Sequence, residues 1–129
     1  MTYSYEKLDV WQKAMQFAGD VMDSIAMMPI KDHHQEFLRK TEGCAAGIAG
    51  AIATGKSYSS NLDFARLLYN SRGALYQTMT LLELLKRKHQ IPEDKFADFD
   101  TRANQLTAML TALIKSIYTP KSDNAKHAS

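Results

Sequence analysis

The 129-residue sequence has little of several features on which small domains often rely. It contains one cysteine, three prolines and six glycines, and its formal net charge is only +2. A single cysteine excludes an internal disulfide and is typical of a reducing compartment, so we expect a cytoplasmic protein. The nearly balanced charge predicts no strong attraction of the whole chain to nucleic acid or to anionic membranes.

Long apolar runs and strand patterns are also missing. The longest uncharged stretch, residues 43–55, is rich in alanine and glycine and is too short and too weakly apolar to span a bilayer. Residues 1–13 lack a basic region followed by an apolar core, so no secretory signal is predicted. No run of alternating β-branched residues predicts a strand. We therefore expect one all-α domain that does not enter a membrane.

What the sequence does contain is helical periodicity in four segments. The clearest lies near the C-terminus, where apolar residues alternate at spacings of three and four, which is typical of coiled-coil-like packing. These residues are Phe96, Phe99, Ala103, Leu106, Leu110, Leu113 and Ile117. A similar stripe in the first segment consists of Leu8, Trp11, Met15, Ala18, Met22 and Ile25, widened by Val10, Ala14 and Val21.

Capping signals divide the four segments. Asp32 with Gln35, and Ser60 with Asp63, each have the spacing of an N-terminal cap, and Gly55 is placed as a C-terminal stop. Short connections force neighbouring helices to be antiparallel. The sequence therefore predicts an up-down-up-down four-helix bundle over residues 1–118, with helices at about 5–28, 33–54, 60–89 and 92–118, followed by a disordered tail over residues 119–129.

Glycines in the middle of the second predicted helix need a physical reason. Gly43, Gly47 and Gly50 each cost a helix about 1 kcal/mol relative to alanine. Close approach of another helix backbone would offset that cost. We favour a neighbouring helix of the same bundle as that partner, with a second subunit as the alternative. Tyr69 and Tyr76 exceed what a monomer core needs, and tyrosine suits an interface with one dry and one wet side.

One complete catalytic-type motif is present. Residues 50–57, Gly-Ala-Ile-Ala-Thr-Gly-Lys-Ser, match the phosphate-binding pattern G-x-x-x-x-G-K-[ST]. A working loop of this kind needs a buried strand before it and a helix starting at the lysine. The residues before Gly50 are helix-like instead, so we interpret the match as a helix end followed by a loop. Nucleotide binding by this segment is the alternative function.

Other chemistry finds no support in the residues. No Glu-x-x-His pair is present, although bundle di-iron sites use two of them, and no metal or other cofactor is predicted. Cys44 lies among small residues and lacks a histidine at helical spacing that would activate it. We therefore predict no catalytic residue and no enzymatic activity.

The densest basic cluster is Lys86, Arg87 and Lys88. We favour its interpretation as a helix end, where positive charge complements the helix dipole. The alternative is a patch that contacts phosphates of nucleic acid, which would gain strength if several copies of the chain were displayed together.

Several segments resemble one bacterial family. Residues 5–14, Tyr-Glu-Lys-Leu-Asp-Val-Trp-Gln-Lys-Ala, are similar to its L-x-V-W-Q-x-A opening, and residues 52–55 are similar to its I-A-E-G. Asp63-Phe64, residues 72–74 and Leu113-Ile114 follow in matching order. The family consists of four-helix bundles first noticed in intervening sequences of large-subunit ribosomal RNA genes and often mislabelled as a ribosomal protein. The chain departs from it at Glu42-Gly43, where many members carry two arginines, and at Thr54 in place of glutamate.

The resemblance implies a cytosolic four-helix bundle that assembles as a homopentamer. It also implies a distant similarity to the accessory proteins of diversity-generating retroelements, which are pentameric bundles that bind nucleic acid and a reverse transcriptase. No enzymatic activity is implied. Taken with the residues, it predicts a non-enzymatic, self-associating interaction scaffold, with RNA or a nucleic-acid enzyme as candidate partners.

Overall fold

The chain is described by a computed structural model that covers residues 3–119. The disordered tail predicted for residues 119–129 lies outside the described residues, except for Thr119. Within residues 3–119 all regular secondary structure is helical, without a strand, as predicted. Four long helices follow a short 3₁₀ turn, and another 3₁₀ turn precedes the second of them. The elements are η1 (Ser4–Lys7), α1 (Asp9–Met27), η2 (Asp32–His34), α2 (Gln35–Lys56), α3 (Asn61–Arg87) and α4 (Glu93–Tyr118).

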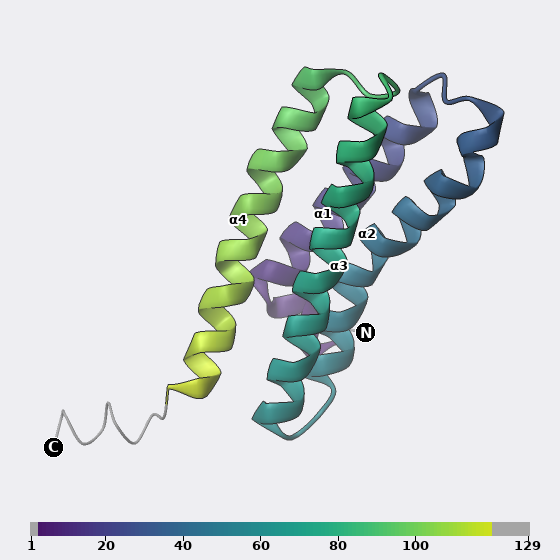
Figure 1. Cartoon of the computed structure of the whole chain (residues 1–129). Coiled ribbons are helices and arrows are strands. Elements are labelled where there is room, and N and C mark those ends of the chain that lie inside the picture. The colour runs from purple at the N-terminus through teal and green to yellow at the C-terminus, as the bar shows by residue number, and fades with distance from the viewer. Residues whose placement is uncertain (1–2, 120–129) are drawn as a thin grey trace, which may run out of the picture.

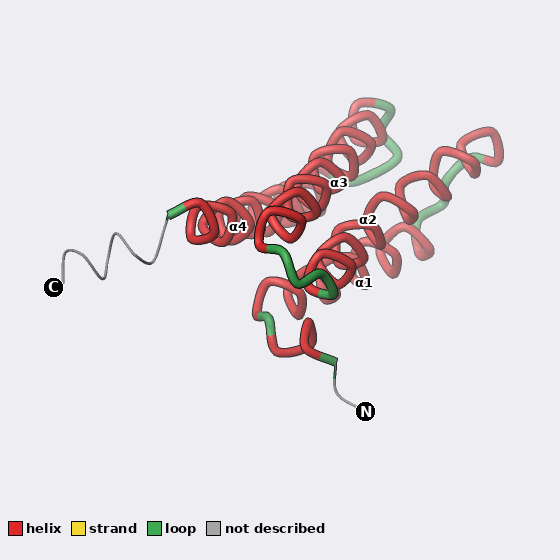
Figure 2. The backbone as a smooth tube through the Cα atoms, turned by 90° about the horizontal axis from the view of Figure 1, so that it is seen from below, coloured by secondary structure: helices red, strands yellow, loops and turns green. Residues whose placement is uncertain are grey.

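The four helices pack side by side around one core. The α1–α2 and α3–α4 connections lie at one end and the α2–α3 connection at the other (Figure 1). Seen along the helices, α3 and α4 form one layer and α1 and α2 the other (Figure 2). The α2–α3 contact is the most extensive, and the α1–α4 contact is the least extensive of the four contacts between long helices. No helix within residues 3–119 has the length and apolar character needed to cross a membrane.

Helix α4 has the core face that its periodicity predicts. Phe99, Ala103, Leu106 and Leu110 are buried, and Leu110 is completely inaccessible to solvent. At its C-terminal end the stripe shifts by one position, since Ile114 is buried. Helix α3 likewise buries one apolar face, which includes Phe64, Leu68, Leu75, Leu82 and Leu85.

Helix α1 differs from its predicted stripe. The buried face includes Phe17, which the pattern did not single out, together with Val10, Ala14 and Val21, which were expected only to widen the stripe. Met15, expected at the centre of the stripe, is 48% exposed. The reason is the neighbouring helix: the Met15 side of α1 faces alanines and glycines of α2, which are too short to cover it.

Helix ends agree with the capping signals in one case and differ in two. The Ser60 hydroxyl accepts a hydrogen bond from the Asp63 backbone N–H at 3.3 Å, which confirms that cap. Asp32 instead begins the turn η2, and α2 starts at Gln35 without a side-chain cap. Gly55 does not stop α2 but lies inside its last turn with an ordinary helical backbone, because the helix continues to Lys56.

Gly55 has a packing role in place of a stopping role. A Cβ atom built on it would lie 2.8 Å from the Leu67 Cβ and 2.9 Å from the Phe64 ring of α3. Real Cβ atoms essentially never approach so closely. Glycine at this position therefore lets the end of α2 lie directly against the first turns of α3.

Candidate functional site

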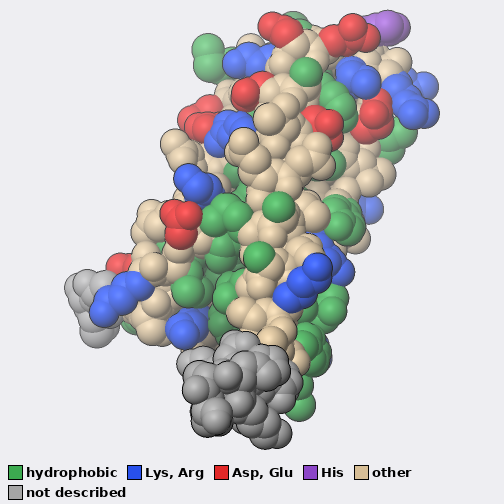
Figure 3. All heavy atoms as spheres, turned by 90° about the vertical axis from the view of Figure 1, so that its left-hand side faces the viewer, with side chains coloured by type: hydrophobic (Ala, Val, Ile, Leu, Met, Phe, Trp, Pro, Cys, Tyr) green, Lys and Arg blue, Asp and Glu red, His purple; other side chains and the backbone are tan. Residues whose placement is uncertain are grey.

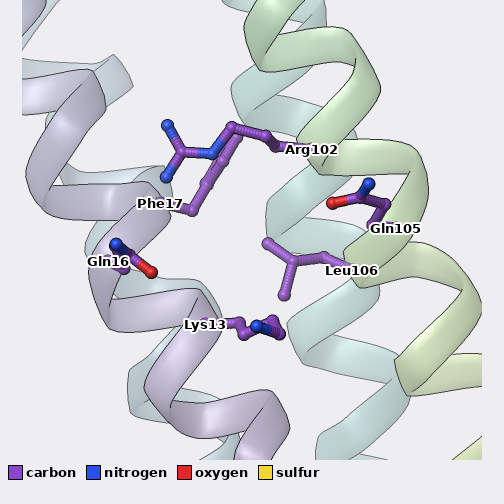
Figure 4. A pocket seen from close by; sticks show the side chains of 6 residues that line it. All are labelled: Lys13, Gln16, Phe17, Arg102, Gln105 and Leu106. Carbon is purple, nitrogen blue, oxygen red and sulfur yellow. The ribbon is translucent and has the colours of Figure 1, made fainter.

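A small pocket between α1 and α4 is the first place to look for chemistry. Its volume is about 100 Å³, and the side chains of Lys13, Gln16, Phe17, Arg102, Gln105 and Leu106 line it (Figure 4). The Arg102 guanidinium reaches from α4 across the Phe17 ring toward α1 and forms an ion pair with Asp20 at 2.7 Å. None of these lining residues is a carboxylate, histidine, serine or cysteine. Lys13 is the one lining residue of a type that enzymes use as a nucleophile or general base, and no second group of this kind accompanies it in the lining.

The basic cluster at the end of α3 is partly neutralised. Glu83 lies 3.0 Å from the Lys86 ammonium and 3.4 Å from the Arg87 guanidinium. The hydrogen bond from Lys86, and the charges of both cations, hold the pKa of the Glu83 carboxyl below its ordinary value. Lys86 also lies 4.4 Å from the centre of the Phe96 ring. Lys88 is exposed just beyond the helix.

Charges elsewhere do not add to this cluster on the face of the molecule shown in Figure 3. There, acidic and basic side chains alternate over the upper part, and no single sign dominates it (Figure 3). A phosphate-binding surface would need a continuous positive patch. The contact of Lys86, Arg87 and Lys88 with nucleic acid accordingly stays a prediction.

The glycines of α2 do not lie where the sequence analysis favoured. Apart from atoms of their own helix, no heavy atom of the described chain lies within 4 Å of a Cβ placed on Gly43 or Gly50. Gly47 faces the Ala74 Cβ of α3 at 3.7 Å, which is an ordinary contact. Close approach of a neighbouring helix within the bundle is thus wrong for Gly43 and Gly50, because both lie on the outward face of α2. The alternative, contact with a second subunit, stays a prediction.

The phosphate-binding motif match is helical. Residues 50–56 continue α2, so their backbone N–H groups donate within the helix and cannot surround a phosphate. The Lys56 ammonium lies over the Phe64 ring, 5.5 Å from its centre. The Ser57 hydroxyl donates to the Thr54 carbonyl oxygen at 2.6 Å. A phosphate loop at Gly50–Ser57 is therefore wrong, and the segment is a helix end, as its context predicted.

Apolar side chains point outward along α3. Tyr69 and Tyr76 are 44% and 51% exposed, and Leu62 in the first turn is 65% exposed. These three residues recur every seven positions, so they lie on one line along the helix. Gly73 lies between the two tyrosines with open space around it. We call this line, Leu62, Tyr69, Gly73 and Tyr76, the α3 stripe.

A second apolar surface lies between α1 and α2. It is an open groove of about 390 Å³, and the exposed area of its lining is mostly apolar. Its lining includes Trp11, Met15, Gly19 and Met22 from α1, and Ala46 and Gly50 from α2. We call it the α1–α2 groove. The apolar periodicity of α1 assigns these methionines to the core and so does not predict the groove, although the alanines and glycines of α2 were a signal that nothing would cover them.

Metal-binding and thiol chemistry find no constellation in residues 3–119. No group of three histidine, cysteine or carboxylate side chains there is arranged to hold a metal ion. The Cys44 thiol is half-buried and lies 3.6 Å from the Gln77 side-chain oxygen, to which it donates. The Gln77 side chain is uncharged and would not activate a thiolate at Cys44.

Comparison with known proteins places this all-helical architecture. The sequence model of the 23S rRNA-intervening sequence protein family matches residues 6–112, which is most of the chain. The chain belongs to this family. The match confirms the resemblance found in the opening residues and in the order of the later motifs.

One solved structure shares the fold of this chain. A crystal structure of a protein of unknown function from the S23 ribosomal protein family of Bacteroides thetaiotaomicron superposes with a TM-score of 0.75. The superposition covers 82% of this chain and 98% of that one, at 19% sequence identity. At this identity the likeness concerns the fold. No curated protein matches the sequence.

Proposed function

We propose that this intervening-sequence protein is a non-enzymatic interaction scaffold of the cytoplasm that assembles from copies of itself. The observation that carries the proposal is the α3 stripe. Large apolar side chains that stand half exposed in a line are costly to leave in water, and such patches are typical of protein interfaces. Tyrosine is enriched at interfaces because its ring can be buried while its hydroxyl stays hydrated.

The number of copies we propose is five, arranged around an axis, as the family resemblance implies. We propose that the helices of each copy run up-down-up-down and antiparallel, because connections of only four to seven residues join them. This arrangement turns one side of α3 outward along its whole length. A non-enzymatic role is supported by the pocket between α1 and α4, whose lining has Lys13 but no histidine, carboxylate, serine or cysteine to act with it.

Light scattering after size exclusion tests self-association. We expect a mass of about five chains at micromolar concentration, against 14.5 kDa for the single chain. A monodisperse monomer under these conditions would end the proposal, since the α3 stripe would then have no partner of its own kind.

Association with RNA is a second candidate function, which the exposed cations Arg87 and Lys88 favour. Because Glu83 offsets part of the cluster's charge, one chain would bind weakly, and several copies displayed together would be needed. A gel shift with structured RNA at increasing salt measures this. Replacing Arg87 and Lys88 with alanine should weaken binding and reduce its salt dependence, while Lys115→Ala on α4 serves as the matched control. Equal binding by both variants would remove this candidate.

A further inference from the structure

The molecule has two exposed apolar surfaces of opposite shape. The α3 stripe is a ridge, because its tyrosines and leucine project from a helix. The α1–α2 groove is a depression, because Gly19 and Gly50 along it have nothing within 4 Å of a Cβ position. The ridge of one copy can enter the depression of another copy but not its own, since the two surfaces lie on different helices.

We propose that the α3 stripe of one copy docks in the α1–α2 groove of the next copy, head to tail. This inference rests on the self-association proposed above and assigns its two surfaces. Heterologous contacts of this kind generate closed rings when the rotation between neighbours closes. An assembly of five copies therefore follows from repeating a single contact.

The two surfaces have similar lengths. From Trp11 to Met22 the groove follows α1 for about 16 Å, at the standard helical rise. From Leu62 to Tyr76 the stripe follows α3 for about 21 Å by the same measure. Small residues at the bottom of a groove let a second helix approach closely, which is the setting in which mid-helix glycine is tolerated. Gly50, which no helix of its own bundle approaches, thereby gains a partner.

The charges beside the two surfaces are complementary. Arg66 and Arg72 flank the stripe, and the Arg72 guanidinium lies 4.9 Å from the centre of the Tyr69 ring. Among residues 3–119, Arg66 forms an ion pair only with half-exposed Asp63, at 3.7 Å. On the groove side, Glu42 precedes Ala46 of α2 by one helical turn, so it borders the groove. Within residues 3–119 the Glu42 carboxylate forms no ion pair.

Symmetric pairings fit less well. Two stripes placed face to face would bring the arginines of both copies together, and like charges across an interface oppose association. Two grooves placed face to face would leave the space at Gly19 and Gly50 unfilled, and unfilled space forfeits packing contacts. Only the pairing of stripe with groove joins ridge to depression and arginine to carboxylate.

Two variants, each damaging one surface, test the proposal when they are mixed. Gly50→Arg fills the groove at an exposed helical position, and Tyr76→Glu places a charge on the stripe. Each alone should lose the assembled mass in light scattering. An equimolar mixture should give a species of two chains, because the intact stripe of the first variant enters the intact groove of the second and neither can extend further. Recovery of this species also shows that both variants are folded.

Two control substitutions lie away from both surfaces. Ala108→Arg and Asn104→Glu, both at exposed positions of α4, should keep the wild-type mass. If Gly50→Arg assembles like the wild type, or if the mixture of the two variants stays monomeric, the groove is not the partner of the stripe and this inference is overturned. A wild-type monomer, in contrast, overturns the proposed self-association itself.

Discussion

Replacing Gly55 with alanine should destabilise the bundle, although alanine is the better helix former. The added Cβ would lie 2.8 Å from the Leu67 Cβ, which belongs to a helix backbone position and cannot swing away. Overpacking a well-packed core costs about 1–3 kcal/mol, whereas exchanging glycine for alanine inside a helix gains at most about 1 kcal/mol. We expect a net loss of about 1–2 kcal/mol in the free energy of unfolding.

The matched control is Gly43→Ala, in the same helix. Nothing lies within 4 Å of a Cβ at this position, so the propensity gain of about 0.5–1 kcal/mol should appear undiminished. The two alanine substitutions thus have opposite signs. Urea unfolding followed by helical circular dichroism measures both, at one fixed protein concentration because assembly couples to stability.

The decisive quantity is the difference between the two variants. We expect Gly55→Ala to unfold at lower urea than the wild type and Gly43→Ala at higher urea. If Gly55→Ala proves as stable as Gly43→Ala, the close contact of α2 with α3 at Gly55 does not exist. The explanation for glycine at that position would then fall with it.

Three further outcomes follow from particular contacts. Leu110→Asp should unfold the domain, with a loss of about 4 kcal/mol or more, because a fully buried site would receive an unpaired charge; a folded variant by circular dichroism would show that the core face of α4 is misassigned. Ser60→Ala should cost about 1 kcal/mol in urea unfolding, since the Asp63 N–H loses its acceptor, and an unchanged midpoint would contradict the cap. The Glu83 carboxyl should titrate below its ordinary pKa in NMR, and Lys86→Ala should raise that pKa, so an unchanged pKa in this variant would refute the assigned cause. The ionised Glu83 carboxylate stabilises the fold at pH values above its unfolded-state pKa, and this contribution disappears as the pH falls through its folded-state pKa.

Much of the fold was predictable because its signals are local. The three-four spacing in α4 and the Ser60 cap depend only on residues close in sequence, and both are confirmed. The face of α1 was predicted less well because Met15 and Phe17 are equally apolar, and only the neighbouring helix decides which of them is covered. The sequence pattern of α1 does not show that one side of this helix faces alanines and glycines of α2 while α4 packs against the other side.

For the candidate surfaces, too, some features were predictable from the sequence and others depend on how the helices pack. That Tyr69 and Tyr76 lie outside the core was predictable from their surplus over a monomer's needs, and both are about half exposed. The place of Gly50 was not, because glycine in a helix signals close approach without saying which helix approaches. Its outward position follows from the bundle as a whole, in which α3 meets α2 at Gly47 and Gly55.

The tight contact at Gly55 has a consequence for the size of the assembly. In a head-to-tail ring, the groove belongs partly to α2 and the stripe belongs to α3. The packing of α2 against α3 therefore fixes the rotation from one copy to the next. The number of copies that closes the circle depends on that rotation. A bulkier residue at position 55 that the bundle survives should therefore change the count of subunits, or open the circle into a filament, while leaving every residue of the contact itself unaltered.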